Sequence, residues 1–228
     1  MYQLYIANKN YSSWSLRPWV LMREQGIAFV ERQVPFGNLP GQPDYRSFSP
    51  TASVPVLVDG DLTVWDSLAI VEYLAERHPG IWPEDAAARA WARSAAAEMH
   101  SGFRSLRNIC GMSCGVRVAL RERPAELERD VARMGELWNQ GLDRFGGPFL
   151  AGAKFTAADA YFAPVVFRAL TYGLDFGGRA GDYVATMLAT AAMREWYAAA
   201  LAETWRDKPH EDEIEASGTV TQDLRART

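Results

Sequence analysis

The chain has 228 residues, of which 48% are hydrophobic and 23% charged, and its formal net charge is −4. This composition is typical of a folded globular protein, and the acidic balance without a basic stripe argues against nucleic acid as a main partner. Two cysteines and three histidines are too few for a disulfide framework or a zinc site, so no metal is expected.

Neither a membrane span nor a secretory leader is expected from the apolar pattern. No window approaches the roughly 20 unbroken apolar residues that a transmembrane helix needs. The first ten residues, MYQLYIANKN, lack a basic start followed by an apolar run and a cleavage site. We therefore expect a reduced, cytoplasmic protein with no membrane partner.

Residues 1–80 alternate between strand and helix patterns. The expected elements are a strand over 2–7, a helix over 16–26, a strand over 28–36, a long polar loop, two short strands around 59–61, and an amphipathic helix over 66–78. Asp59-Gly60-Asp61 is a hairpin signal. This order is typical of an α/β, thioredoxin-like fold.

The pattern changes after a connector rich in proline and glycine, residues 78–85. From Ala86 onward only helical patterns are found, over 86 to about 110, 124–145, 156 to about 172, 182–188 and 193–205. The stretch from Asp207 is polar and charged, which favours a loosely ordered tail. The expected domains are an α/β domain over 1–80, an all-helical domain over 86–206, and a polar tail over 207–228.

Val54-Pro55 places a proline inside a strand pattern, where it lacks the N–H that a sheet needs. One interpretation is an edge strand or a strand start. The other is a cis peptide bond that leaves the N–H and C=O of Val54 facing outward. Those groups could pair with an extended peptide in antiparallel β fashion.

Asp66 and Ser67 precede a strong helix pattern, and capping alone would explain either residue. A helix N-terminus also binds carboxylates through its free N–H groups and its dipole. Ser67 could therefore hold the α-carboxylate of a bound peptide, while Asp66 pairs with the ammonium group.

The stretch NYSSWSLRPWVL, Asn10 to Leu21, contains three serines and Pro18. Proline is tolerated in the first turn of a helix, where its missing N–H has no partner. Pro18 therefore predicts that Ser15 is the N-cap. Ser12 and Ser13 are left in the preceding loop, where a hydroxyl can donate to a thiolate and lower the pKa of the thiol. The alternative is that the serines only solvate a loop.

Together these motifs resemble the cytosolic glutathione S-transferases, most closely zeta-like bacterial members. SSWSLRPWVL resembles the zeta-class Ser-Ser-Cys-Ser-x-Arg signature, and ASVPVLVDGDLTVWDSLAIVEYLAER resembles the Val-Pro and Glu/Gln-Ser glutathione motifs. Thr156 and Asp159 have capping-box spacing and match the helix-capping motif of that family. The likeness covers about residues 2–205.

The resemblance implies glutathione as co-substrate, a homodimer, and a helical domain that supplies the electrophile pocket. Ser12 stands at the catalytic serine position, with Ser13 its nearest rival. Val54, followed by Pro55, would pair with the cysteinyl backbone, and Asp66 with Ser67 would hold the γ-glutamyl group.

The sequence departs from the zeta pattern at three places. Trp14 replaces the cysteine after the serine pair, and Arg104 with Arg107 replace a glutamine pair. Thr171 aligns with an arginine that binds a substrate carboxylate in the zeta class, and Arg168 lies one turn earlier. The candidate substrate-pocket residues are Trp14, Arg104, Arg107 and Arg168.

Several side chains allow more than one interpretation. Arg104 and Arg107, three residues apart, would share one helix face. In one interpretation that face is solvated or belongs to a dimer interface. In the other, the two arginines stabilise the thiolate or bind an anionic second substrate. Cys110 and Cys114 are interpreted as ordinary buried thiols, and His100 as a surface or packing residue.

The leading hypothesis is a detoxifying glutathione transferase. Its thiolate, stabilised by a serine hydroxyl, attacks a small electrophile. One alternative is a glutathione-dependent cis–trans isomerase of the maleylacetoacetate type. The other is a non-catalytic member of the fold that binds glutathione or a protein partner.

Overall fold

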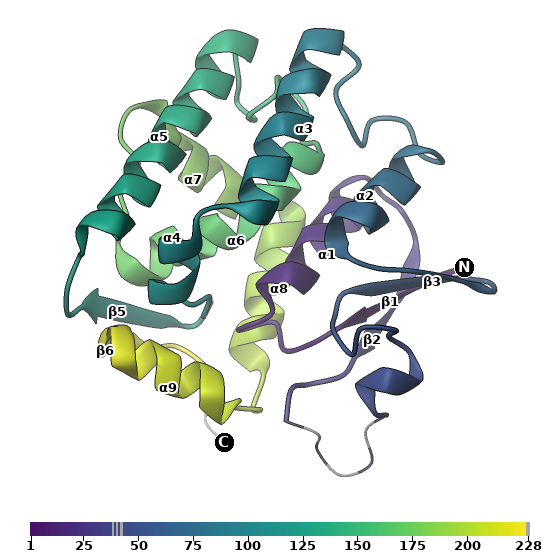
Figure 1. The fold of residues 1–228 in the computed structure, drawn as a ribbon, viewed down its shortest axis with the longest axis horizontal. Coiled ribbons are helices and arrows are strands. Elements are labelled where there is room, and N and C mark those ends of the chain that lie inside the picture. Colours follow the sequence, from purple (N-terminus) through teal and green to yellow (C-terminus); the bar gives the residue numbers. More distant parts are fainter. Residues whose placement is uncertain (38, 40, 42, 227–228) are drawn as a thin grey trace.

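The computed structural model describes residues 1–37, 39, 41 and 43–226, and its first part is an α/β unit (Figure 1). The elements of this part are β1 (Tyr2–Ile6), α1 (Ser13–Glu24), β2 (Phe29–Gln33), the 3-10 turn η1 (Tyr45–Ser47), β3 (Val56–Asp59), β4 (Leu62–Val64) and α2 (Ser67–Ala75). The strands form one sheet in the order β2-β1-β3-β4, with β1 parallel to β2 and antiparallel to β3. The predicted hairpin is confirmed, because Asp59 pairs with Leu62.

The start of α1 differs from the prediction. The helix begins at Ser13, so Ser12 rather than Ser15 stands at the N-cap position, and Pro18 lies inside the helix. Backbone N–H groups of Tyr11 and Ser12 donate to the carbonyl of Asn8. This turn leads directly into the helix at Ser13, so that Pro18 no longer falls in the first helical turn. The prediction that Ser15 caps the helix was wrong because tertiary packing of the apolar face of α1 outweighs one lost backbone bond.

The second part is helical, as predicted, apart from one strand. It contains α3 (Ala86–Ser101), α4 (Arg104–Ile109), β5 (Val116–Leu120), α5 (Ala125–Phe145), α6 (Ala157–Tyr172), α7 (Arg179–Ala189) and α8 (Ala191–Ala202). Helix α6 is buried at all but one of its positions and packs against α1, α3 and α7. Contacts of α1 with α6 and α8 place the loop before α1 at the junction of the two parts.

The predicted helix from Ala86 to about Cys110 is divided into α3 and α4. Phe103 has φ of 54° and a buried side chain, so the chain turns sharply there. The preceding Gly102 allows a close approach, because a Cβ atom at this position would lie 2.8 Å from the Glu98 carbonyl oxygen. The division gives α4 its own orientation and brings Arg107 toward Trp14.

The prediction of a loosely ordered tail from Asp207 was wrong. This segment forms α9 (Lys208–Ser217) and β6 (Gly218–Asp223), and β6 pairs antiparallel with β5. Figure 1 shows α9 beside the β5–β6 pair, below the helical part. Sequence patterns indicated neither strand, because each depends on the other for its hydrogen bonds.

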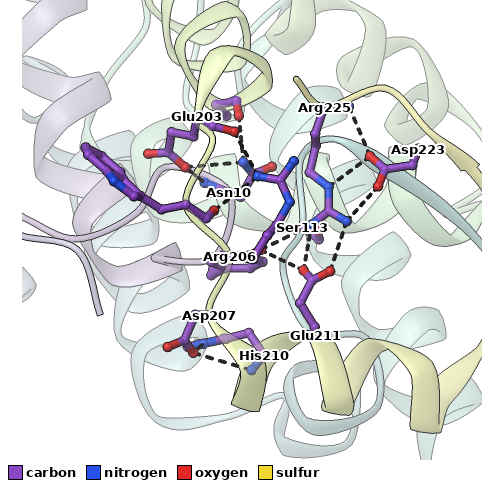
Figure 2. Close-up of polar contacts among 12 residues, drawn as sticks. Asn10, Ser113, Glu203, Arg206, Asp207, His210, Glu211, Asp223 and Arg225 are labelled. Atoms are coloured by element: carbon purple, nitrogen blue, oxygen red, sulfur yellow. Dashed lines mark hydrogen bonds and ion pairs between the residues drawn. The ribbon is translucent and has the colours of Figure 1, made fainter. Parts of the chain in front are cut away.

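Arg225 joins the tail to the loop before α1. Its guanidinium is buried and hydrogen-bonds Glu211 at 2.5 and 2.9 Å, Asp223 at 2.8 and 2.9 Å, and the Tyr11 hydroxyl at 3.1 Å (Figure 2). Its aliphatic stem lies so near Gly115 that a Cβ there would be 2.2 Å from the Arg225 Cγ. The Tyr11 hydroxyl also donates to Glu211 at 2.6 Å.

Replacing Arg225 by alanine is expected to release α9 and β6 from the rest of the protein. Loss of one partner leaves the Glu211 carboxylate half-buried without its cation, and breaking a buried ion pair costs about 3–5 kcal/mol. Hydrogen exchange should therefore accelerate in residues 208–223. The control is Arg123→Ala, which removes an exposed ion pair with Glu128 and should change exchange little. Equal exchange in both variants would contradict the prediction.

Candidate active site

Two neighbouring cavities lie where the loop before α1 meets α2, α4 and α9. The larger has a volume of about 630 Å³, and its lining includes Ser12, Ser13, Arg107, Arg168 and His210. The smaller has a volume of about 590 Å³, and its lining includes Pro55, Asp66 and Ser67. Trp14 and Val54 line both cavities. The structure thus brings together almost all of the site residues expected from the sequence.

The loop that carries Ser12 is held by a buried carboxylate at the end of α8. Glu203 accepts hydrogen bonds from the backbone N–H groups of Lys9 (2.6 Å) and Asn10 (3.1 Å), as Figure 2 shows for Asn10. The indole of Trp196 donates to the Lys9 carbonyl at 2.9 Å. Burial raises the pKa of Glu203, and the hydrogen bonds oppose that rise. These contacts fix the direction in which the loop presents its serines.

The Ser12 hydroxyl is buried and donates to the hydroxyl of Ser15 at 2.7 Å. The Ser15 oxygen also accepts the N–H of Ala7 at 3.3 Å. Ser13 is half-buried at the first position of α1. Sequence reasoning assigned Ser15 to helix capping and missed this contact, since nothing in the local pattern indicates that a helical serine turns back toward the preceding residue.

The Val54–Pro55 peptide bond is cis, which confirms that interpretation. Val54 is half-buried between the two cavities, and the described part of the chain offers no hydrogen-bond partner to its N–H or its C=O. The neighbouring Ser53 is held instead, because its N–H and C=O both bond the Ser49 hydroxyl. The backbone of Val54 is therefore available to an extended ligand.

The start of α2 faces the smaller cavity. Asp66 is the N-cap, and its carboxylate accepts the N–H of Leu68 at 2.9 Å while remaining exposed. Ser67 is buried at the first position of the helix, with its hydroxyl 3.5 Å from that of Tyr161. The second carboxylate oxygen of Asp66 lies 3.4 Å from Nε2 of His100. A helix N-terminus and an exposed carboxylate thus stand side by side.

Comparison with known proteins agrees with this arrangement. A model described as glutathione S-transferase, N-terminal domain, matches residues 11–77, and one described as glutathione S-transferase, C-terminal domain, matches residues 117–207. The chain belongs to the glutathione S-transferase family. The fold of this family, a mixed-sheet domain followed by a helical domain, is the fold described above.

Individual relatives are distant. A glutathione S-transferase zeta class of Euphorbia esula is 28% identical over 70% of this chain and 73% of its own length. A probable maleylacetoacetate isomerase of Vibrio cholerae is 27% identical over 72% of this chain and 80% of its own. A glutathione transferase homolog from Burkholderia, solved with bound glutathione, has a TM-score of 0.64 at 22% identity and covers 92% of this chain and 98% of its own.

Within this transferase-family site, Trp14 lies between arginines. The guanidinium carbon of Arg17 is 4.0 Å from the Trp14 ring centroid, and that of Arg107 is 4.6 Å from it. His100 meets the edge of the same ring at 5.2 Å between centroids. Burial lowers the pKa of His100, and the neighbouring Asp66 opposes that shift. This burial favours the neutral form of His100, whose ring packs between Asp66 and Trp14.

Arg17 is a buried cation that sequence reasoning overlooked. It is 1% exposed and lies 4.9 Å from the Tyr161 ring centroid. Its Nε and one terminal nitrogen have no hydrogen-bond partner among the described residues. Burial, with help from the charges of Arg168 and Arg107, lowers the pKa of Arg17 to about 9. The signal was present, because Arg17 stands at the arginine of the Ser-Ser-Cys-Ser-x-Arg signature that this stretch resembles.

The remaining candidates are two arginines and two cysteines. Arg168 is buried and lines the larger cavity, with Nε donating to the Cys110 carbonyl at 2.7 Å, and burial lowers its pKa to about 10. Arg104 is exposed at the start of α4 and lines neither cavity. Cys110 and Cys114 are buried free thiols, as predicted, and burial raises the pKa of Cys110 to about 11. Such thiols are unreactive at neutral pH.

Proposed function

We propose that this protein is a glutathione transferase in which Ser12 stabilises the glutathione thiolate. The observation that carries the proposal is the position of Ser12. Its hydroxyl is buried at the N-terminus of α1, in the wall of the larger cavity and two residues from Trp14, which also lines the smaller one. A hydroxyl donor and a helix N-terminus both favour the charged form of a thiol.

Glutathione would occupy the smaller cavity as co-substrate. Its γ-glutamyl carboxylate would meet the N-terminus of α2 at Ser67, and its ammonium the exposed carboxylate of Asp66. The cysteinyl backbone would pair with the free N–H and C=O of Val54. This places the thiol at the boundary between the cavities, where Trp14 and Ser12 lie.

The chemical step is nucleophilic attack by the thiolate on an electrophilic carbon. In the structure the Ser12 hydroxyl donates to Ser15. Hydroxyl hydrogens rotate to suit their acceptor, so with a thiolate bound Ser12 would donate to the sulfur and Ser15 would donate to Ser12. Ser12 and Ser15 thus form a short relay directed at sulfur. The new carbon–sulfur bond forms as the electrophile accepts an electron pair or loses a leaving group.

The larger cavity would hold the electrophile. Arg107 and Arg168 line this cavity, and neither forms an ion pair with a carboxylate among the described residues. Cations that lack a protein counter-ion favour an anionic or strongly polarised second substrate. Arg104 lies outside this cavity and has no part in the proposal.

Glutathione-dependent cis–trans isomerisation is a second candidate. It uses the same thiolate, which adds to a double bond and then leaves. Two observations favour it: Arg168 lies in the cavity one turn before Thr171, and a relative carries the name probable maleylacetoacetate isomerase. A cation at this place would hold a substrate carboxylate.

The remaining expectations follow from the family. We propose that the protein detoxifies electrophiles in the cytoplasm and acts as a homodimer. Within the described residues, no helix is long and apolar enough to span a membrane.

The test is to measure binding to immobilised glutathione and turnover with a dinitrochlorobenzene and a panel of other electrophiles. The proposal expects both binding and conjugation. Binding without turnover of any electrophile would instead identify a non-catalytic glutathione-binding protein. Turnover restricted to a cis-dienoic acid, with a trans product and no consumption of glutathione, would identify an isomerase.

A further inference from the structure

Asp207 and His210 form a hydrogen-bonded pair where the tail meets the larger cavity. Asp207 is buried and caps α9 by accepting the His210 N–H at 3.4 Å. The same carboxylate oxygen hydrogen-bonds Nδ1 of the His210 ring, and Figure 2 shows the two side chains facing one another. The family match ends at residue 207, so it says nothing of α9.

Aromatic neighbours fix the orientation of the His210 ring. It stacks on Tyr11 with centroids 5.1 Å apart and planes 22° apart, and on Phe36 with centroids 5.0 Å apart and planes 25° apart. Its side chain is 32% exposed and lines the cavity that contains Ser12 and Ser13. Asp207 occupies Nδ1, and the described residues offer no hydrogen bond to the other ring nitrogen, Nε2.

An imidazole oriented by a carboxylate at one nitrogen, with the second nitrogen open to a reaction cavity, is suited to proton transfer. The mechanism proposed above leaves a role for such a group, because Ser12 can stabilise a thiolate but is too weak a base to accept the thiol proton. The Tyr11 hydroxyl is already engaged as a donor to Glu211. His210 supplies the function that the serines lack.

We propose that His210, held by Asp207, is the acid–base group of this site. The proposal rests on the glutathione transferase function. Nε2 accepts the thiol proton, and the sulfur then forms a bond to the β-carbon of an enone, whose double-bond electrons move to an enolate. The imidazolium returns the proton to the α-carbon, and His210 is neutral again. With an aryl halide, the halide leaves with its bonding electrons and the proton passes to solvent.

Other ionisable groups face this part of the cavity and compete for the role. Those in contact with His210 are Tyr11 and Asp207, the latter already bonded to Nδ1. The cavity wall adds Asp44, Tyr45, Arg107, Arg168 and Glu213, and Glu211 with Arg225 lies behind Tyr11. Of these, Glu213 on α9 is the strongest rival, because it shares the helix and the cavity with His210.

The test compares His210→Gln, Asp207→Asn and Glu213→Gln, with His78→Gln as the matched control. His78 hydrogen-bonds the Tyr2 hydroxyl at 3.1 Å and has no part in the site. The probe is conjugation of glutathione to a phenyl-substituted enone across pH 5 to 9, with glutathione binding measured for every variant. Wild-type kcat/KM should fall toward acidic pH, because a protonated imidazole accepts no proton.

His210→Gln should lower kcat about 100-fold and leave the glutathione dissociation constant unchanged. The fall in kcat/KM that remains at low pH should then follow the protonation of the bound thiol alone. Added imidazole should restore part of the rate. Asp207→Asn should shift the inflection without removing it, and this result is informative even if His210→Gln fails to fold. His78→Gln should behave as wild type.

Wild-type kcat and an unchanged pH profile in His210→Gln would overturn the proposal, as would finding the loss of kcat and the altered pH profile in Glu213→Gln instead. Both outcomes leave the transferase function intact, since the wild type still turns over. A wild type that neither binds glutathione nor conjugates it would overturn the function itself and this proposal with it.

Discussion

Replacing Ser12 by alanine is expected to lower kcat/KM for glutathione conjugation by about 100- to 1,000-fold, the usual effect of losing one preorganised donor to a developing or existing anion. The hydroxyl is buried beside the helix N-terminus, so water replaces it poorly. We expect Val54, Asp66 and Ser67 to hold most of the glutathione molecule. Binding to immobilised glutathione should therefore persist in the variant.

Ser13→Ala is the matched control for this experiment. Ser13 lines the same cavity, but its hydroxyl is half-buried and has no hydrogen bond among the described residues. It lacks the Ser15 partner that orients Ser12. Steady-state kinetics should show little change in Ser13→Ala. If Ser13→Ala abolished turnover while Ser12→Ala retained it, the catalytic serine would be Ser13.

Replacing Asp159 by alanine is expected to destabilise the protein by about 3–5 kcal/mol, because it leaves several buried donors without an acceptor. The fully buried carboxylate accepts the N–H groups of Leu150 (3.0 Å) and Thr156 (2.9 Å), and the hydroxyls of Thr156 (3.2 Å) and Tyr183 (3.1 Å). With Thr156 it forms the capping box of α6, the central helix of the second part.

Thermal unfolding measures this effect, and Tm should fall by about 10 °C for a protein of this size. The control is Asp182→Ala, which removes an exposed acidic residue in the first turn of α7 and should change the free energy of unfolding by at most about 0.5 kcal/mol. Similar Tm values for Asp159→Ala and the control would contradict the assigned role.

The same carboxyl predicts a pH dependence. Burial raises the pKa of Asp159 to about 6, although its four hydrogen bonds oppose the rise. The folded state then retains a proton that the unfolded state releases, so stability decreases as pH rises from about 4 to 6. The contribution is up to about 3 kcal/mol. The free energy of unfolding of wild type, relative to the non-titrating Asp159→Asn, should fall across this window. A flat or rising difference would show that the pKa is not raised.

The parts of the site that sequence predicted are those set by local backbone chemistry. A proline in a strand pattern indicated the cis bond at Val54, and Asp66 before an apolar helix indicated its cap. Ser12 could be placed beside a helix N-terminus even though the exact start was misassigned, because the loop before α1 was recognisable from its composition.

The rest depends on contacts between distant segments. Arg17 is buried because Tyr161 of α6 covers it, and α4 separates from α3 because Phe103 turns into the core. The tail folds because β6 pairs with β5 and because Arg225 hydrogen-bonds Glu211 and Tyr11. The local sequence around each of these residues has no distinctive pattern, so neither secondary-structure propensity nor hydrophobic periodicity predicts that the distant segments come together.

Titration of bound glutathione distinguishes a site that stabilises the thiolate through Ser12 from one that does not. The ultraviolet absorbance of the thiolate, followed from pH 5 to 9 in the binary complex, gives the pKa of the thiol. A free thiol titrates near pH 8.5, and the pKa of the thiol in the wild-type complex should lie at least about 1 unit lower. Ser12→Ala should return it toward the free value. If the wild-type thiol titrates like free glutathione, or if the shift survives in Ser12→Ala, Ser12 does not stabilise the thiolate.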